Sequence, residues 1–393
     1  MDRPVIRLKP KADPRPVRWG RPWVYASDLV LDRRTKSLAP GSLARLEDGE
    51  RRALATVAFN PGSKIAVRVL DPDPEVEIGR EWFAARLERA LALRERIYEA
   101  PFYRLVHAEA DGLPGVVIDR FGEICVVQPN AAWAEALLGS LAEALVDVTG
   151  CRTVLKNAGG RARGLEGLDD VSGVLVGAAP EGPARVPMNG AVYLADLTGG
   201  QKTGLFYDQR ENHAFVARLC RGASVLDVFS HVGGFSLAAL AGGARQALAV
   251  DGSAAALELA QGGARAMGRE LAIRRGDAFE VMEALAGEGA VFDVVICDPP
   301  AFAPSKQALN AGLRAYEKVA RRAAPLVAEG GILCLCSCSG SADLEAFRAA
   351  SVRGIGRAGR QGALIYTGFA GPDHPVHPQL SETGYLKALV FRL

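Results

Sequence analysis

Two short segments carry the residue types with the clearest chemistry. The first is Asp298-Pro-Pro-Ala-Phe302, which directly follows an apolar run. Prolines lack the N–H donor and fix φ, so the chain must leave a β-sheet at Asp298. Ligands of open parallel sheets bind at the carboxyl ends of the strands. The segment therefore predicts a rigid loop whose acid, Pro299, Pro300 and Phe302 face a flat substrate; the alternative is an ordinary turn.

The second segment is Ser337-Cys-Ser-Gly340, which follows the apolar run 331–336. Cys338 falls just past the end of this expected strand, next to where Asp298 should emerge from the adjacent strand. A thiol among small polar residues is within reach of a substrate, and local donors favour its thiolate. Cys338 is therefore the candidate nucleophile; the alternative is a third buried thiol.

Cysteines at alternating positions also raise the question of a metal site. Strand alternation would put Cys334, Cys336 and Cys338 on one side. The usual C-x-x-C pairs and a nearby fourth ligand are missing, so we expect no metal. Cys334 and Cys336, like Cys297, are expected in the core, where free cysteine usually lies.

The elements that must position these segments belong to a doubly wound α/β domain. From about Val186 the chain alternates strands, glycine-containing loops and helices. After the first strand, 224–228, Gly233 and Gly234 would let a ligand approach the backbone at a helix start. The spacing Gly-x-Gly-x-x-Gly and a phosphate-binding Lys-Ser/Thr are both missing. This pattern argues against dinucleotide and nucleoside-triphosphate binding.

Acids follow the next strands. Asp251 ends the second strand, roughly 20 residues past the glycines, where a carboxylate can bind ribose hydroxyls. Asp277, after the third strand, could accept a hydrogen bond from an adenine amino group. Any one acid could merely cap a helix; together with Asp298 they describe S-adenosylmethionine. The cofactor-binding candidates from these loops are Asp227, Phe229, Gly233, Gly234, Asp251, Asp277, Ala278 and Asp298.

Length and composition indicate a globular protein of two or three domains. The chain has 393 residues, of which 49% are hydrophobic and 23% charged. No apolar run approaches the ~20 residues of a membrane span, and no signal peptide is evident. Seven cysteines without a disulfide pattern favour reduced thiols. We expect a cytoplasmic protein with no membrane partner.

Charge is distributed unevenly along the chain. Residues 1–72 hold 15 Lys or Arg against 8 Asp or Glu, net +7, so residues 73–393 sum to −5. Basic residues such as Arg21 are interleaved with rings such as Trp23, which offers cations for phosphates and rings for unpaired bases. We expect this segment to bind RNA, with a merely solvated basic face as the alternative.

The pattern of elements divides the chain into three parts. Residues 1–72 contain short alternating segments separated by Gly and Pro, typical of a small β-barrel. Residues 73–185 predict a small α+β domain with helices at 81–99 and 132–148. Residues 186–393 form the doubly wound domain. The run that starts at Asp71 has the Pro and charge pattern of a solvated linker.

Several spaced motifs in this order resemble a known family over essentially the whole chain. The chain is similar to the bacterial RlmI-type 23S ribosomal RNA large-subunit (cytosine-5) methyltransferases. The matching segments are Arg21-Pro-Trp-Val-Tyr, Asp111-Gly-Leu-Pro-Gly, Asp119-Arg-Phe, Lys202-Thr-Gly-Leu-Phe-Tyr-Asp-Gln-Arg-Glu-Asn, 229–235, Asp298-Pro-Pro-Ala-Phe, Ser337-Cys-Ser-Gly, Asp373-His-Pro and Tyr385-Leu-Lys. The resemblance implies a PUA-like RNA-binding β-barrel, a middle α+β domain and a C-terminal Rossmann-like class I methyltransferase domain.

The resemblance also implies roles for residues. Phe206, Gln209 and Arg210 would close over S-adenosylmethionine, and Cys338 would be the nucleophile. His231 stands where a tyrosine is expected, which leaves its role open. The implied substrate is an unpaired or flipped cytosine of ribosomal RNA. A homodimer is one oligomeric state that this reading allows.

Cytosine chemistry explains why a thiol and an acid belong together. Carbon 5 of cytosine is a poor nucleophile, so a thiolate first adds at carbon 6 and moves electron density onto carbon 5. We assign this step to Cys338. Asp298 could donate a hydrogen bond or proton to the ring nitrogen if burial raises its pKa. Phe302 is expected to stack on the base.

Three alternatives stay open at this level. Methylation of a purine nitrogen also suits an acid-Pro-Pro-aromatic loop, but it needs no nucleophile such as Cys338. A non-enzymatic RNA-binding or ribosome assembly factor would explain the basic N-terminus but not the intact cofactor acids. An NAD-dependent dehydrogenase lacks its glycine fingerprint here.

Overall fold

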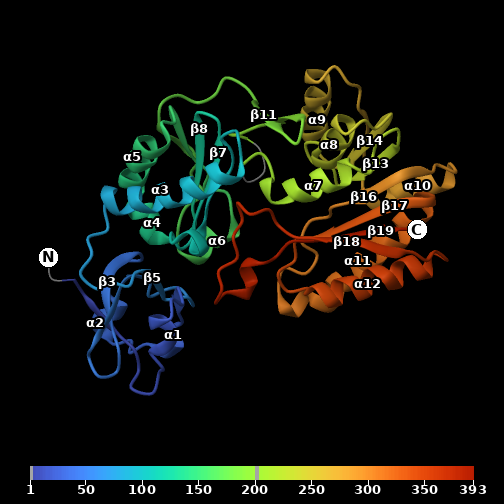
Figure 1. Ribbon diagram of the computed structural model, residues 1–393. Coiled ribbons are helices and arrows are strands. Elements are labelled where there is room, and N and C mark those ends of the chain that lie inside the picture. The colour runs from blue at the N-terminus through green and yellow to red at the C-terminus, as the bar shows by residue number, and fades with distance from the viewer. Residues whose placement is uncertain (1–2, 200–202) are drawn as a thin grey trace. The chain divides into compact units, whose positions relative to one another are not determined.

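The computed structural model describes residues 3–199 and 203–393 (Figure 1). The motif residue Lys202 lies outside this description. The chain divides into two compact units. The first holds Met1–Glu181, Leu197–Thr203 and Asp373–Ser381, and the second holds Gly182–Asp196, Gly204–Pro372 and Glu382–Leu393. Two late segments thus belong to the first unit, which the sequence pattern does not predict. The domain boundaries expected at residues 73 and 186 stay predictions.

The N-terminal part of the first unit is built on a sheet of order β1-β3-β4-β5-β2. Its strands are β1 (Val5–Arg7), β2 (Trp23–Val24), β3 (Ser42–Glu47), β4 (Ala53–Phe59) and β5 (Val67–Asp71), with short helices α1 (Arg15–Arg18) and α2 (Arg33–Lys36). Apolar side chains such as Ile6, Leu46 and Phe59 are fully buried between these elements. The strands expected from residue alternation are confirmed at β3, β4 and β5.

The remainder of the first unit has a second sheet, of order β10-β9-β8-β7-β6. Its elements are α3 (Arg80–Ile97), β6 (Phe102–His107), β7 (Val116–Phe121), β8 (Ile124–Pro129), α4 (Ala132–Ala136), α5 (Leu138–Thr149), β9 (Thr153–Lys156), α6 (Arg161–Leu165) and β10 (Gly173–Val176). The helix expected at 132–148 is confirmed over nearly all of these residues, but it is divided into α4 and α5. The break lies at Leu137, which has φ −109° and ψ 17°, and Trp133 of α4 stacks on Phe83 of α3 with ring centroids 5.9 Å apart.

The solvated linker expected to start at Asp71 is exposed at Pro72, Asp73 and Glu75, but Asp71 itself does not belong to it. Asp71 is the last residue of β5, and its carboxylate accepts hydrogen bonds from the Trp82 indole at 2.9 Å and from the Arg86 guanidinium at 2.6 Å. Burial acts to raise the pKa of Asp71, but the backbone N–H of Asp73 and the side chains of Trp82 and Arg86 hold this pKa below its usual value. The carboxylate of Asp71, at the end of β5, is therefore paired with side chains of α3 and is not simply solvated.

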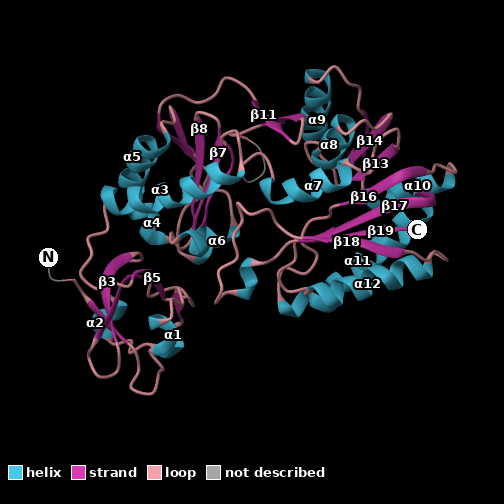
Figure 2. Ribbon diagram, in the orientation of Figure 1, coloured by secondary structure: helices cyan, strands magenta, loops and turns pink. Residues whose placement is uncertain are grey.

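The second unit contains the sheet that positions the candidate site (Figure 2). Its order is β15-β14-β13-β16-β17-β19-β18. The strands are β13 (Ser224–Val228), β14 (Gln246–Asp251), β15 (Ala272–Arg275), β16 (Phe292–Cys297), β17 (Val327–Ser337), β18 (Ala363–Gly368) and β19 (Lys387–Arg392), preceded by the hairpin β11 (Ala184–Met188) and β12 (Ala191–Ala195). Strands β13 to β17 pair in parallel, whereas β19 is antiparallel to β17 and β18.

Helices cover both faces of this sheet. They are α7 (Arg210–Ala217), α8 (Gly234–Ala241), α9 (Ala254–Ala266), α10 (Ala278–Gly287), α11 (Leu309–Ala323) and α12 (Leu344–Arg357). Helices α8 and α9 lie on one face and α11 and α12 on the other, as Figure 1 shows. This is the doubly wound arrangement that the alternation predicts, and it puts the carboxyl ends of the parallel strands along one edge. Among the helices described, none is long and apolar enough to cross a membrane.

Candidate active site

The loops after β16 and β17 are tied together, which brings the two chemical segments of the sequence into one place. The Sγ of Cys338 lies 3.9 Å from the carbonyl oxygen of Pro299. The buried hydroxyl of Ser339 accepts a hydrogen bond from the backbone N–H of Ala303 at 3.0 Å. The same hydroxyl lies 2.7 Å from the phenol oxygen of Tyr316 in α11. Ser339 and Tyr316 thus fix the two loops against each other, and the sequence pattern singled out neither.

Cys338 differs in exposure from every other cysteine. It is half-buried, whereas the remaining six cysteines are buried. Cys334 and Cys336 project to one side of β17 with their sulfur atoms 3.9 Å apart, and burial raises the pKa of Cys336 and of Cys297 well above the usual value. Buried thiols of raised pKa stay protonated and unreactive. Cys338 is the thiol that a substrate can reach.

Asp227 gives the strongest indication of a cofactor. Its carboxylate is fully buried within β13, and its Oδ2 accepts a hydrogen bond from the backbone N–H of Ser236 at 2.8 Å. Burial raises the pKa of Asp227 to about 7. Among the described residues, its Oδ1 has no hydrogen-bond partner, and neither have the Oγ of Ser230 and the Nε2 of Gln209. Buried polar atoms are normally satisfied, so the unpaired oxygen of Asp227 fits a ligand with a cationic, hydrogen-bonding end, as the amino acid part of S-adenosylmethionine has.

The glycine loop before α8 is shaped mainly by its protein neighbours. Gly233 has φ +83°, which L side chains rarely adopt. A Cβ added at Gly234 would lie 2.8 Å from the Nε2 of His213. His213 is buried, and burial lowers its pKa to about 3, so its ring is neutral. The glycines are required by backbone conformation and by this ring, a constraint that the sequence pattern did not suggest.

Asp251 and the loop residue His231 are linked directly. The Oδ2 of Asp251 accepts the backbone N–H of His231 at 2.9 Å, and its Oδ1 accepts that of Ser253 at 2.8 Å. The ring of His231 lies 4.9 Å from that of Phe206, centroid to centroid. The residue found in place of the expected tyrosine therefore keeps an aromatic contact with Phe206, one of the residues predicted to close over the cofactor.

The predicted adenine end of the site is aromatic. Asp277 caps α10 by accepting the backbone N–H groups of Phe279 and Glu280 at 2.9 and 3.2 Å. The rings of Phe229 and Phe279 lie 6.3 Å apart, and Phe302 lies 6.5 Å from each. Ala278 begins α10 beside this cluster. Phe302 thus lies among residues predicted to bind the cofactor, and its stacking on the target base stays a prediction.

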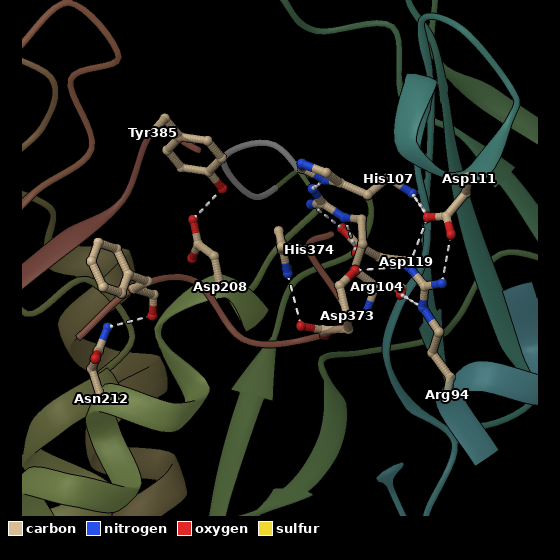
Figure 3. Close-up of polar contacts among 11 residues, drawn as sticks. Arg94, Arg104, His107, Asp111, Asp119, Asp208, Asn212, Asp373, His374 and Tyr385 are labelled. Atoms are coloured by element: carbon tan, nitrogen blue, oxygen red, sulfur yellow. Dashed lines mark hydrogen bonds and ion pairs between the residues drawn. The ribbon is translucent and has the colours of Figure 1, made fainter. Parts of the chain in front are cut away.

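The residues just before α7, and α7 itself, are held by hydrogen bonds to residues near the C-terminal end of the chain. The phenol of Tyr385 donates a hydrogen bond to Asp208 Oδ2 at 2.5 Å, and Asn212 in α7 donates to the carbonyl of Phe369 at 3.2 Å (Figure 3). Asp208 precedes Gln209 in a buried 3₁₀ turn, and Arg210 is the first residue of α7. The three residues predicted to close over the cofactor, Phe206, Gln209 and Arg210, therefore lie in and around a fixed turn.

The first unit contains a buried ion-pair network that the sequence reasoning missed. Arg94 donates to both oxygens of Asp111 at 2.7 Å, and Arg104 donates to the two oxygens of Asp119 at 2.6 and 3.0 Å (Figure 3). Asp373 accepts the backbone N–H of Arg104 at 3.0 Å. Arg94 lies on an amphipathic helix, where a charge usually faces water. Asp111, the first residue of its motif, is therefore held by an ion pair with Arg94.

The basic N-terminal segment offers one exposed ring. Trp19 is 69% exposed, at the rim of a cavity of about 620 Å³ within the first unit that is also lined by Arg89 and His377. Trp23, by contrast, donates its indole N–H to Glu109 at 2.9 Å. The guanidinium of Arg21 lies over the Tyr25 ring, 5.6 Å from its centroid. Trp19 is thus the most accessible aromatic of this segment, although Arg21 and Trp23 were the residues chosen from the sequence.

Comparison with known proteins places this geometry in a family. Residues 168–392 match the family model of S-adenosylmethionine-dependent methyltransferases, and residues 6–72 match that of the PUA-like domain. The chain is 34% identical over 395 residues to the ribosomal RNA large subunit methyltransferase I of Shewanella denitrificans, with 99% of each chain covered. It is 35% identical over 406 residues to the ribosomal RNA large subunit methyltransferase of Deinococcus radiodurans, with 99% and 98% covered.

A solved structure has the same fold. SMU.776, a protein assigned to the methyltransferases and solved in complex with SAH, superposes with a TM-score of 0.83 over 100% of both chains at 19% identity. The expected PUA-like N-terminal domain and the Rossmann-like methyltransferase domain are confirmed, and S-adenosylmethionine is the cofactor, which the buried acid of β13 and its neighbours fit. The chain belongs to the ribosomal RNA large subunit methyltransferase I family of S-adenosylmethionine-dependent methyltransferases.

Proposed function

We propose that this methyltransferase acts on ribosomal RNA of the large subunit (23S) and forms 5-methylcytosine through a covalent adduct with Cys338. One observation carries the proposal: the half-buried thiol of Cys338 lies 3.9 Å from the carbonyl of Pro299 in the loop that starts at Asp298. Methylation of a purine nitrogen needs no nucleophile at this place. The names of the relatives from Shewanella denitrificans and Deinococcus radiodurans supply the RNA class.

The first step is assigned to Cys338. Its thiolate adds to carbon 6 of the cytosine, which breaks the double bond between carbons 5 and 6 and moves the electron pair onto carbon 5. The charge spreads to the ring nitrogen N3, where Asp298 donates a hydrogen bond or a proton. The cofactor supplies an electrophilic methyl group for carbon 5. A base or water takes the carbon-5 proton, N3 returns any proton it received to Asp298, and the double bond between carbons 5 and 6 re-forms as the bond from carbon 6 to sulfur breaks and Cys338 leaves as thiolate.

The residues that hold the cofactor are assigned from the strand ends. Asp227 would accept hydrogen bonds from the ammonium group of the methionine part. Asp251 would accept hydrogen bonds from the ribose hydroxyls, and Asp277 would accept one from the adenine amino group. The buried unpaired Oδ1 of Asp227 supports the first assignment. Phe229, Gly233, Gly234 and Ala278 would line the same site, and Phe206, Gln209 and Arg210 would cover it.

Binding of RNA is assigned to the N-terminal segment. A cytosine must be unpaired or flipped out to bring carbon 6 to a thiol at the sheet edge. Pro299 and Pro300 hold the loop that would face it rigidly. Arg21 would contact phosphate, and the rings of Trp23 and the more exposed Trp19 would contact the RNA near it.

One experiment tests the proposal directly. The protein is incubated with methyl-labelled S-adenosylmethionine and unmodified large-subunit ribosomal RNA, and the labelled nucleoside is identified after complete digestion. We expect label in 5-methylcytosine alone. Label in a methylated purine would overturn the assignment of both the base and the thiol. A matched reaction with Cys338→Ala is expected to give no labelled nucleoside.

A further inference from the structure

Lys387 is a buried cation that none of the steps above uses. It is the first residue of β19, lies opposite Ser337 of β17 and is 4% exposed. Among the described residues, it forms no ion pair. A lysine is almost never fully buried without a paired charge, because removing an ammonium from water is costly. Its position therefore calls for an explanation.

The hydrogen bonds of Lys387 all go to the loop that carries Cys338. Its Nζ donates to the carbonyl of Ser339 at 2.7 Å and to that of Ala342 at 2.5 Å. Ser339 directly follows Cys338, and its hydroxyl in turn accepts the N–H of Ala303 in the loop after β16. An ammonium carries three donor hydrogens, and these two carbonyls take two of them. The ammonium thus holds the loop that carries the thiol through the carbonyls of Ser339 and Ala342.

Four titratable side chains come from elements at this edge of the sheet. Lys387 comes from β19, Tyr316 from α11, Asp343 from the start of α12 and Asp298 from the end of β16. Burial lowers the pKa of Lys387, while the charges of Cys338 and Asp343 act in the opposite direction. Burial likewise raises the pKa of Tyr316 and keeps its phenol neutral. Lys387 is the single cation in this set, which otherwise holds acids and a neutral phenol.

We propose that Lys387 is the positioning residue of the Cys338 loop, and that its ammonium favours the thiolate form of the nucleophile. The inference rests on the proposed function of Cys338 and adds to it the source of the positive charge. A thiolate needs a cation, a donor or a helix N-terminus nearby to exist at neutral pH. The short segment Tyr385-Leu-Lys387 then serves both halves of the site, because Tyr385 fixes Asp208 beside the cofactor residues.

Alkylation of the full-length protein by iodoacetamide tests the inference without any methylation. Cys338 is the half-buried thiol and the other six are buried, so the native rate reports on Cys338. A Cys338→Ser sample gives the background. Three variants separate charge from hydrogen bonding: Lys387→Arg keeps the charge, Lys387→Gln keeps donors without charge, and Lys387→Met removes both. Arg357→Met, on the exposed surface of α12, controls for a general loss of charge.

We expect the midpoint of the alkylation rate against pH to rise by about one unit or more in Lys387→Gln. Lys387→Arg and Arg357→Met should keep the wild-type midpoint. Methyl transfer at pH 7 should fall about tenfold in Lys387→Gln, with unchanged KM for RNA, and should recover at pH 9. An unchanged midpoint in a folded Lys387→Gln protein would overturn the proposal.

Failure of this inference and failure of the proposed function give different results. If Cys338→Ser keeps full methyl transfer, the proposed nucleophile is wrong whatever the alkylation profile. If Cys338→Ser is inactive but Lys387→Gln alkylates and methylates as the wild type does, only the role of Lys387 is wrong. Lys387→Met is expected to lower the melting temperature because two carbonyls lose their donor, so Lys387→Gln, which keeps donors, decides the matter.

Discussion

The sulfur of Cys338 and the carbonyl oxygen of Pro299 lie 3.9 Å apart, although 39 positions separate them in the chain. Adjacent parallel strands β16 and β17 end side by side, so the loops that follow them meet at one edge of the sheet. Ser339 then fixes their distance by accepting the N–H of Ala303 at 3.0 Å. The thiol and the Asp-Pro-Pro loop thus form one site.

This relationship predicts that Cys338→Ala abolishes methyl transfer while cofactor binding survives. The substitution removes the proposed nucleophile but changes none of the residues assigned to the cofactor. Transfer should fall at least about 10³-fold, as for other covalent nucleophiles. Calorimetric titration with S-adenosylhomocysteine measures binding, and labelled transfer measures activity. Cys336→Ala, which removes a buried thiol of the same strand, is the matched control and should keep the nucleophile's activity. Undiminished transfer by Cys338→Ala would rule out the covalent mechanism.

A second prediction concerns Asp227, whose buried carboxylate should lower the stability of the cofactor-free protein while it serves cofactor binding. Burial raises its pKa from 3.8 to about 7 in the folded protein, so the folded state binds more protons than the unfolded state between these values. The stability of the cofactor-free wild type should therefore fall as pH rises from ~4 to ~7, by at most about 4 kcal/mol from this group. Asp227→Asn should lack this loss.

Urea unfolding at pH 4 and pH 8 measures this effect. We expect Asp227→Asn to be more stable than the wild type by about 1–3 kcal/mol at pH 8 and by little at pH 4, since the amide leaves one buried polar atom unsatisfied. Cofactor affinity should fall at least about tenfold, because the carboxylate that would accept the ammonium is gone. If the wild type and Asp227→Asn differ in stability by the same amount at pH 4 and at pH 8, burial does not raise the pKa of Asp227 as described.

The buried network of the first unit predicts a large effect of Arg94. Its guanidinium has no exposed area and donates to both oxygens of Asp111 at 2.7 Å. Arg94→Met leaves a buried carboxylate unpaired and should lower the free energy of unfolding by about 3–5 kcal/mol. Arg274→Met, which breaks the exposed pair with Glu288, should cost less than about 1 kcal/mol. Denaturant titration of both variants checks this, and similar small losses in both would show that the network contributes little.

RNA binding is best tested by point substitution. Arg68 pairs with Glu109 at 3.2 Å and with Glu166 at 3.0 Å, all three largely buried, so removal of residues 1–72 would expose unpaired acids of the first unit. Trp19→Ala should weaken binding of unmodified ribosomal RNA by about 1–3 kcal/mol without changing its salt dependence. Trp19→Phe, which keeps a ring, should bind nearly as the wild type does.

Arg21→Gln should act on the salt dependence instead. Loss of one phosphate contact lowers the slope of log affinity against log salt by about 0.7–0.9. Fluorescence anisotropy at several salt concentrations measures this slope. If neither Trp19→Ala nor Arg21→Gln changes binding, the basic segment is a solvated face and the RNA contacts lie elsewhere.

Much of the fold follows from local patterns in the sequence. Alternating and apolar runs located β3, β4, β5, β13, β14 and β16, because strand formation depends on residues that are close in the chain. The same reasoning made one helix of residues 132–148 and missed the interruption at Leu137, because leucine is a good helix former and does not mark a break. It also treated Asp71 as solvated, because the partners Trp82 and Arg86 lie on a helix that follows a turn.

The sequence by itself determined the kinds of groups in the candidate site: an acid before two prolines, a thiol past a strand end and acids after consecutive strands. Only the tertiary structure decided which of them are buried or supported. Among the described residues, a buried Oδ1 without a hydrogen-bond partner distinguishes Asp227 from the helix cap Asp277. The hydrogen bonds of Lys387 to the Cys338 loop join residues that local patterns treat separately. Burial and pairing depend on residues far apart in the chain, so they arise only when the sheet has assembled.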